Sequence, residues 1–309
     1  LATDIAITTT GAANFNGGIT MGGTTPSLTI GDAGAEDTKI VFDGNAQDFH
    51  IGLDDSADDL VIGVGSALGT TTAISITDGR AVTVGEAGIA SSIGGIPFYN
   101  GDTTSIYTHD VSGTDSSATD NTAFGKNALD AITSATNNVA VGHDAGTAVT
   151  TGGFSVFVGA DAGKAQTTGN TNVGIGYQAL AANVDGDRNT AVGTLAFAAL
   201  DPSSNADMEN VAVGYYAGAA NTTGDYNTFV GAVAGTTVTT GANNTLIGRY
   251  AGGNFDTESN NTAVGQNALA GPINGGEYNV AIGNNALDAL TTADNNVAIG
   301  YQAGSAVTT

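Results

Sequence analysis

One short phrase recurs along the chain at a constant spacing. It reads Asn-Thr-Ala-Phe-Gly at 121–125 and Asn-Thr-Ala-Val-Gly at both 189–193 and 261–265. The closing glycine occurs eleven times, and the spacing between consecutive copies is 17 in every interval except one of 21 and one of 18. A short fixed period over such a length is typical of a solenoid in which each repeat forms one coil. The repeat glycines are Gly125, Gly142, Gly159, Gly176, Gly193, Gly214, Gly231, Gly248, Gly265, Gly283 and Gly300.

Positions counted from this glycine have constant character. Position −3 is Thr or Val, position −1 is Val, Ile or Phe, and position +3 is always Ala. Positions −3 and −1 share one face of a short strand, because strand side chains alternate, and β-branched residues suit that pleat. We therefore predict a parallel β-roll or β-solenoid over 121–309, whose eleven rungs would span roughly 50 Å. An α-helical solenoid is the rival interpretation, but one repeat is too short to hold two helices and two turns.

The residue at −2 is also apolar, so the strand is predicted to be buried on both faces. We expect one face to line the core of the coil and the −2 column to face neighbouring copies at the axis of a parallel homotrimer, because soluble proteins seldom expose a continuous apolar stripe. The predicted trimer-facing column is Ala123, Ala140, Phe157, Gly174, Ala191, Ala212, Phe229, Leu246, Ala263, Ala281 and Ala298.

The remaining constant positions predict how coils stack. The repeat glycine and the Ala at +3 fit a tight corner where a bulky side chain would clash. Position −4 is Asn in ten copies and Ser155 in the other, so we expect a ladder of side-chain amides from coil to coil. Thr-Thr-Gly, as at 150–152 and 239–241, supplies a turn on the far side.

The N-terminal third lacks the phrase. Residues 1–92 contain short alternating segments divided by turn residues about every ten positions, which predicts a β-strand shaft resembling a β-prism. Residues 93–120 are polar and break both patterns, so we interpret them as a connector or cap. The expected strands lie at 27–32, 39–44, 48–55, 59–65, 73–79 and 81–86.

Two families carry similar phrases. The repeats, such as Asn-Val-Ala-Ile-Gly at 279–283, resemble those in the heads of trimeric autotransporter adhesins, which form a parallel β-roll, and those of bacteriophage tail fibres. Residues 37–66 resemble a segment of phage tail fibres. The resemblance implies a virion location, other tail proteins as partners and a C-terminal chaperone that is cut off, although nothing in the chain matches that chaperone. The chain begins with Leu1 and has no leader, so we expect a processed or truncated piece.

Composition excludes several classes of function. Six Lys and Arg against 30 Asp and Glu give a formal net charge of −24, which argues against binding to nucleic acid or anionic lipid. No apolar run approaches the length of a membrane span. The chain has no Cys, so neither a disulfide framework nor a thiolate zinc site is possible.

We find no motif typical of catalysis. His50, His109 and His143 have no second His nearby, and we expect surface or strand-edge positions for them. The acidic turn of Asp54, Asp55, Asp58 and Asp59 and the Asp-Gly-Asp at 185–187 lack the pattern of a calcium loop, although weak calcium binding stays open. We therefore expect no catalytic residue, no cofactor and no tightly bound metal. A polysaccharide-cleaving fibre would need paired carboxylates in a groove and is the less favoured alternative.

The variable residues after each repeat glycine predict the surface. Exposed tyrosines there could stack on glycans, or they could merely cover the coil beneath. We hypothesise a non-enzymatic trimeric fibre of a phage tail that binds a cell-surface glycan or protein. The alternative is a bacterial surface adhesin or extracellular filament subunit. The candidate glycan contacts are Tyr177, Tyr215, Tyr216, Tyr250 and Tyr301.

Overall fold

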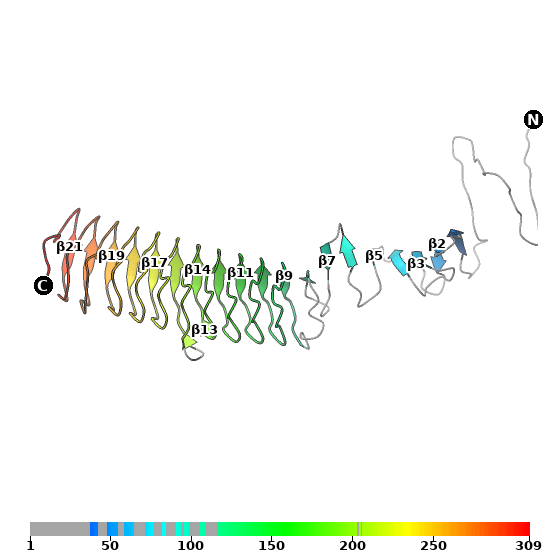
Figure 1. Cartoon of the computed structure of the whole chain (residues 1–309), viewed down its shortest axis with the longest axis horizontal. Coiled ribbons are helices and arrows are strands. Elements are labelled where there is room, and N and C mark those ends of the chain that lie inside the picture. The colour runs from blue at the N-terminus through cyan, green and yellow to red at the C-terminus, as the bar shows by residue number, and fades with distance from the viewer. Residues whose placement is uncertain are drawn as a thin grey trace, which may run out of the picture. The chain divides into compact units, whose positions relative to one another are not determined.

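The computed structural model of the chain is all-β (Figure 1). Short strands alternate with turns and bends, and no helix occurs among the described residues. The chain divides into two compact units, residues 1–86 and residues 87–309. The described residues are 38–42, 48–54, 59–64, 72–76, 82–84, 91–93, 96–98, 106–108, 117–202, 204 and 206–309.

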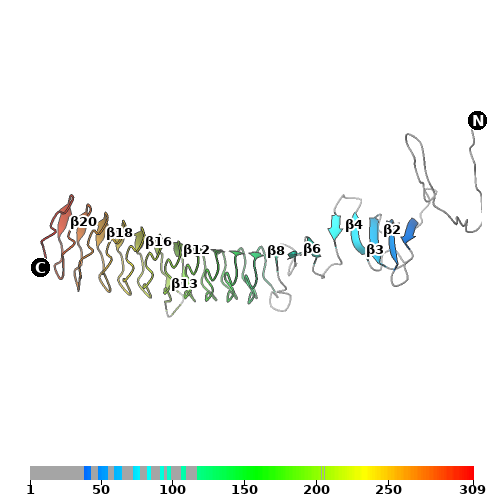
Figure 2. The same ribbon diagram turned by 45° about the horizontal axis from the view of Figure 1, so that its top comes forward.

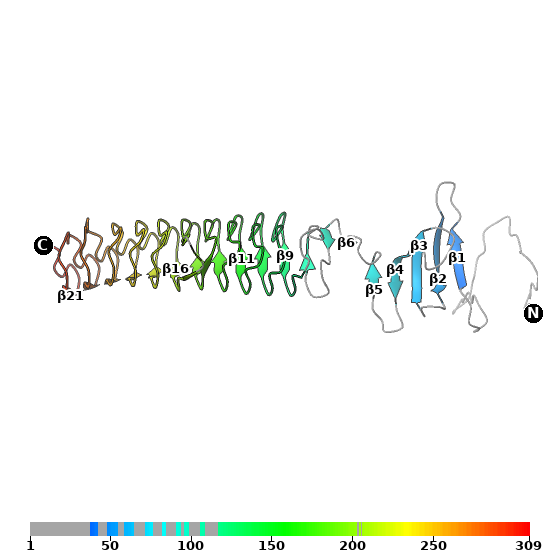
Figure 3. The same cartoon turned by 90° about the horizontal axis from the view of Figure 1, so that it is seen from below.

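The first unit holds an antiparallel meander in which strands pair in the order β1-β2-β3-β4-β5 (Figure 3). These strands match five of the six segments expected from the sequence, and the sixth, at 27–32, lies outside the described residues. Every pairing within the meander is antiparallel. The strands are β1 (Thr38–Phe42), β2 (Phe49–Asp54), β3 (Asp59–Val64), β4 (Thr72–Ile76) and β5 (Val82–Val84).

One face of this meander is apolar and exposed. Ile40, Ile51 and Ile62 lie opposite one another across β1, β2 and β3, and each is exposed. The opposite face is buried at His50 and Val61. His50 therefore lies inside a central strand, and the expectation that it sits at the surface or a strand edge was wrong. The alternation of side chains between two faces was visible in the sequence. It did not reveal which face is buried, because both faces carry residues that occur in strands.

The second unit begins with an antiparallel hairpin and continues as a 12-stranded parallel sheet, drawn as a ladder of short arrows in Figure 2. The sheet confirms a parallel β-solenoid in which one repeat of the sequence forms one coil. β6 (Ser91–Ile93) and β7 (Ile96–Phe98) form the hairpin. The sheet contains β8 (Ile106–Tyr107), β9 (Thr122–Phe124), β10 (Val139–Val141), β11 (Val156–Val158), β12 (Val173–Ile175), β14 (Thr190–Val192), β16 (Val211–Val213), β17 (Thr228–Val230), β18 (Thr245–Ile247), β19 (Thr262–Val264), β20 (Val280–Ile282) and β21 (Val297–Ile299).

Each repeat residue pairs with its counterpart in the next coil. Val139 lies opposite Val156, and Ala140 lies opposite Phe157. The register extends into the expected connector, because Tyr107 of β8 pairs with Ala123 of β9 and is buried. The described part of 106–120 is therefore continuous with the solenoid rather than a separate cap.

The inward face of each strand is opposite to the one predicted. Ten members of the −2 column are fully buried within the single chain, and the eleventh, Ala298, is partly buried. Positions −3 and −1 point away from the coil, as the exposure of Phe124 and Ile247 shows. The prediction that the −2 column faces other chains was therefore wrong. Ala predominates there because the coil is narrow, and not because three chains converge.

Size compensation inside the coil explains the exceptions to Ala. Position +4 is Gly wherever −2 is large, and Phe157 faces Gly163, where an added Cβ would lie 2.3 Å from the ring. Gly174 at −2 is matched by Leu180 at +4. A Cβ on Gly174 would lie 3.1 Å from Phe157, so this glycine makes room for one ring of its own chain. Interiors are close-packed, so the two positions share one volume.

The asparagine ladder is confirmed and runs inside the coil. Asn227 Oδ1 accepts from the backbone N–H of Asn244 at 2.9 Å, and Asn227 Nδ2 donates to the carbonyl of Gly241 at 2.8 Å. At the exception, Ser155 Oγ accepts from the backbone N–H of Asn172 and from Gln166 Nε2. Since buried polar groups need partners, this column satisfies backbone groups that the short strands leave unpaired.

The repeat glycines allow the closest approach between coils. Gly231 has φ +135°, and a Cβ built on it would lie 2.6 Å from the carbonyl oxygen of Gly248. No side chain fits there, which confirms the predicted tight corner.

The paired volume at −2 and +4 gives the first prediction. We expect Phe157→Ala to lower the free energy of unfolding by about 3–5 kcal/mol, because it leaves a cavity in the coil. Adding Gly163→Leu should recover part of this loss, since it recreates the pair formed by Ala123 and Leu129. Gly163→Leu alone should destabilise by steric clash with Phe157. Urea denaturation of the three variants measures this, and additive losses in the double variant would contradict shared volume.

The ladder gives a second prediction. Asn227→Ala leaves the buried Gly241 carbonyl and the Asn244 N–H without their hydrogen-bond partner. We expect the free energy of unfolding to fall by about 1–3 kcal/mol for each unsatisfied group. Asn274→Ala is the matched control, because Asn274 is exposed and outside the ladder. Equal urea midpoints for the two variants would show that the ladder contributes nothing.

Candidate functional site

The outward side of the 12-stranded sheet forms a surface that we call the strand face, defined as positions −3 and −1 of the eleven coils. Its residues are all Thr, Val, Ile or Phe, so it carries no charge. Phe124 is 49% exposed and Ile247 is 38% exposed. The face is therefore a continuous, largely apolar strip on a chain whose net charge is −24.

The five candidate tyrosines follow the strand at +1 and +2. Tyr177, Tyr215 and Tyr301 at +1 are exposed, whereas Tyr216 and Tyr250 at +2 are half-buried. The rings of Tyr215 and Tyr216 lie 4.4 Å apart between centroids. The side chains at +1 therefore offer open rings, while those at +2 lie partly against the coil.

Tyr250 shows how the +2 position is held. Its hydroxyl donates to Asn254 Oδ1 at 3.0 Å, and a Cβ on Gly253 would lie 2.7 Å from its ring. Tyr250 thus packs against its own coil, as the simpler interpretation of these tyrosines expects. Tyr215 and Tyr177 are the better candidates for contact with a ligand.

A second set of exposed aromatic residues precedes the strand and was missed from the sequence. Phe154, Tyr226 and Tyr278 occupy position −5 and are exposed. All three have positive φ near 55–58°. Alignment at −5 would have revealed the column, but the residues there vary too widely to suggest a shared role.

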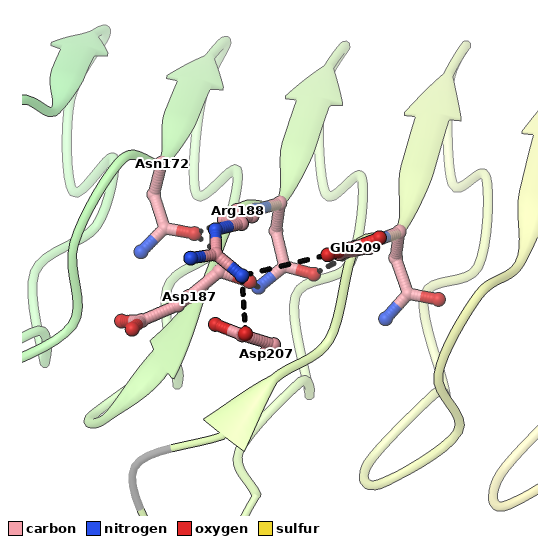
Figure 4. Close-up of polar contacts among 7 residues, drawn as sticks. Asn172, Asp187, Arg188, Asp207 and Glu209 are labelled. Carbon is pink, nitrogen blue, oxygen red and sulfur yellow. Dashed lines mark hydrogen bonds and ion pairs between the residues drawn. The ribbon is translucent and has the colours of Figure 1, made fainter.

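The largest described ion-pair cluster surrounds Arg188 (Figure 4). Its guanidinium contacts Asp207 and lies 3.5 Å from Glu209 Oε1. The hydrogen bond with Asp207 is the main cause that raises the pKa of Arg188. Two short strands, β13 (Gly186–Asp187) and β15 (Ala206–Asp207), pair alongside.

This cluster connects the longest coil to the coil before it. Asp207 and Glu209 belong to the longest interval between repeat glycines, from Gly193 to Gly214, so Arg188 joins the extra segment to the preceding coil. Exposed ion pairs contribute little to stability, and every charge here has a protein partner. We therefore assign it a structural role.

The other acidic candidates also have local partners. Asp185 Oδ1 accepts from Thr168 Oγ1 at 2.6 Å, and Asp187 Oδ1 accepts from the backbone N–H of Asn170 at 2.6 Å. The backbones of Asp54 and Asp59 lie opposite each other where β2 ends and β3 begins. Asp55, Asp58 and His109 lie outside the described residues.

Across the part of the chain that the structure describes, we find no helix with the length and apolarity that crossing a bilayer requires. Comparison of the chain with protein-family models, curated proteins and solved structures yields no match.

Proposed function

We propose that the chain is a structural and adhesive fibre that assembles as a parallel homotrimer and positions or provides receptor binding, as phage tail fibres do. The observation that carries this proposal is the uncharged strand face, which runs along every coil of the solenoid. A surface of this length and apolarity is what a partner of matching shape would cover.

A second copy of the chain is the partner best suited to the strand face. The charge of −24 makes chains repel one another over most of their surface, so contact is least costly where charge is absent. Each copy presents the same columns at the same period, and parallel copies can align coil by coil. Closed threefold symmetry buries the face of every chain at once.

The exposed face of the meander supports the same assembly. Ile40, Phe42, Phe49 and Ile51 are exposed on one side of β1 and β2, and Leu60 and Ile62 extend this side onto β3. In a trimeric shaft these residues would be covered by the neighbouring chains. The β-prism-like shaft is therefore part of the proposal.

The adhesive part of the proposal rests on the exposed tyrosines. Tyr rings offer an apolar face and a polar hydroxyl, which suits the faces and hydroxyls of a cell-surface glycan. Tyr177 and Tyr215 lie at the same position of coils that are two repeats apart, so an extended saccharide could contact both.

The second point of the proposal is whether the fibre belongs to a virion or to a bacterial surface. The resemblance of residues 37–66 to phage fibre segments favours a virion, and the head-like repeats favour a bacterial surface adhesin as the alternative. A phage fibre and a bacterial adhesin would both use the same strand face for assembly and the same tyrosines for adhesion.

Assembly gives the third prediction. Ile247→Asp combined with Ile282→Asp should convert a trimer into a folded monomer, because each substitution places like charges at the threefold contact. Light scattering should give three times the 30.2 kDa chain mass before the change and one chain mass after it. Gln266→Asp, exposed at +1, is the control and should remain trimeric. A monomeric unmodified protein would refute the trimer.

Adhesion gives the fourth prediction. Binding to immobilised lipopolysaccharide or capsular polysaccharide should weaken more than tenfold when Tyr177 and Tyr215 are both replaced by Ser, because the stacking surfaces are lost. Phe154→Ser is the control, since Phe154 lies before the strand. Equal binding by both variants would contradict the assignment. Shortening of the polysaccharide on incubation would indicate a cleaving fibre instead.

A further inference from the structure

The coil period brings three metal-ligating side chains together at positions +1 and +2, in the same columns as the candidate tyrosines but in earlier coils. His143 and Asp144 occupy +1 and +2 of one coil, and Asp161 occupies +2 of the next. One ligand atom from each residue lies within 4.8 Å of the other two. His143 Nδ1 and Asp144 Oδ2 are 3.2 Å apart. Donors bonded at about 2.0–2.2 Å to one tetrahedral ion lie roughly 3.3 Å from each other, so this edge already has a suitable length.

Amide side chains from the flanking coils orient both carboxylates. Asn127 Nδ2 donates to Asp144 Oδ1 at 2.8 Å, which leaves Oδ2 on the side of His143. Gln178 Nε2 donates to Asp161 Oδ2 at 3.2 Å, which leaves Oδ1 without that bond. Outer hydrogen bonds of this kind fix the ligands of metal sites. Asp144 thus directs one oxygen to His143, and Asp161 keeps Oδ1 for another partner.

The two carboxylates repel each other without a cation. Among the eleven +2 positions only Asp144 and Asp161 are acidic, and they lie in adjacent coils. Like charges opposite each other on neighbouring strands are destabilising, and the same holds for coils stacked in this register. The Lys164 ammonium lies 3.8 Å from Asp161 Oδ2 and offsets part of this charge. A divalent ion between the carboxylates would offset both.

Contrary to the expectation from the sequence that the chain holds no tightly bound metal, we propose that His143, Asp144 and Asp161 bind one divalent transition-metal ion, with water completing the coordination. The imidazole favours zinc, nickel or copper over calcium and magnesium, which prefer all-oxygen ligands. The ion would join two consecutive coils on the outside of the solenoid. The site contains no residue of the strand face and none of the candidate tyrosines.

Titration of the 309-residue chain with Zn²⁺, measured by calorimetry, tests the site. We expect saturable binding of one ion per chain, and at least tenfold weaker binding for Asp161→Asn and for His143→Asn. Asparagine at 161 would match the amide side chains of Asn127 and Gln178, which occupy the same +2 position in other coils. Asp225→Asn, a carboxylate away from the cluster, is the control and should bind as the unmodified protein does.

A variant that binds Zn²⁺ more tightly provides a further test, because a variant that fails to fold would lose affinity and not gain it. Lys164→Gln removes the competing ammonium, so Zn²⁺ should bind more tightly while the far-UV circular dichroism stays unchanged. Absence of saturable binding, or equal affinity in the His143 and Asp161 variants, would overturn the proposal. Equal affinity for Ca²⁺ that does not depend on His143 would overturn the transition-metal assignment.

Discussion

Stacking of each coil on the next, residue upon equivalent residue, is the constraint on which the rest of the structure depends. The backbones approach so closely at the repeat glycines that a Cβ on Gly231 would lie 2.6 Å from a carbonyl oxygen of the next coil. The same register places each Asn side chain against the backbone of its successor, as Asn227 does for Asn244. A strand of three residues is too short to be stable alone, so its hydrogen bonds to both neighbours hold it in place.

This register also determines what the outside of the protein can do. A residue type at one position becomes a continuous column, so uncharged residues at −3 and −1 produce a continuous, largely apolar strip. An isolated pair of acids, Asp144 and Asp161, becomes a local concentration of charge beside His143. The proposed assembly face and the proposed metal site therefore arise from the same repeat. The assembly face forms because positions −3 and −1 are uncharged in every coil, and the metal site forms because position +2 is acidic in only two adjacent coils.

The period, the strands and the amide ladder could be predicted because they depend on residues that repeat without change. The inward face could not be assigned from the strand alone, since −3, −2 and −1 are all apolar. The deciding signal was the compensation between −2 and +4, where Phe157 is matched by Gly163 and Gly174 by Leu180. The His143 cluster was not predicted because its third member, Asp161, lies 17 residues after Asp144 and approaches His143 and Asp144 only when consecutive coils stack.

The absence of cysteine from the chain allows a direct measurement of which face meets another chain. Single cysteines would replace Ala281 at −2, Ile282 at −1 and Gln266 at +1, and each protein would be treated with a short bismaleimide. Links between chains should form through residue 282, while residue 281 stays protected inside the coil and residue 266 reacts without linking chains. Links through 281 in place of 282 would contradict the assignment of the strand face as the surface of assembly.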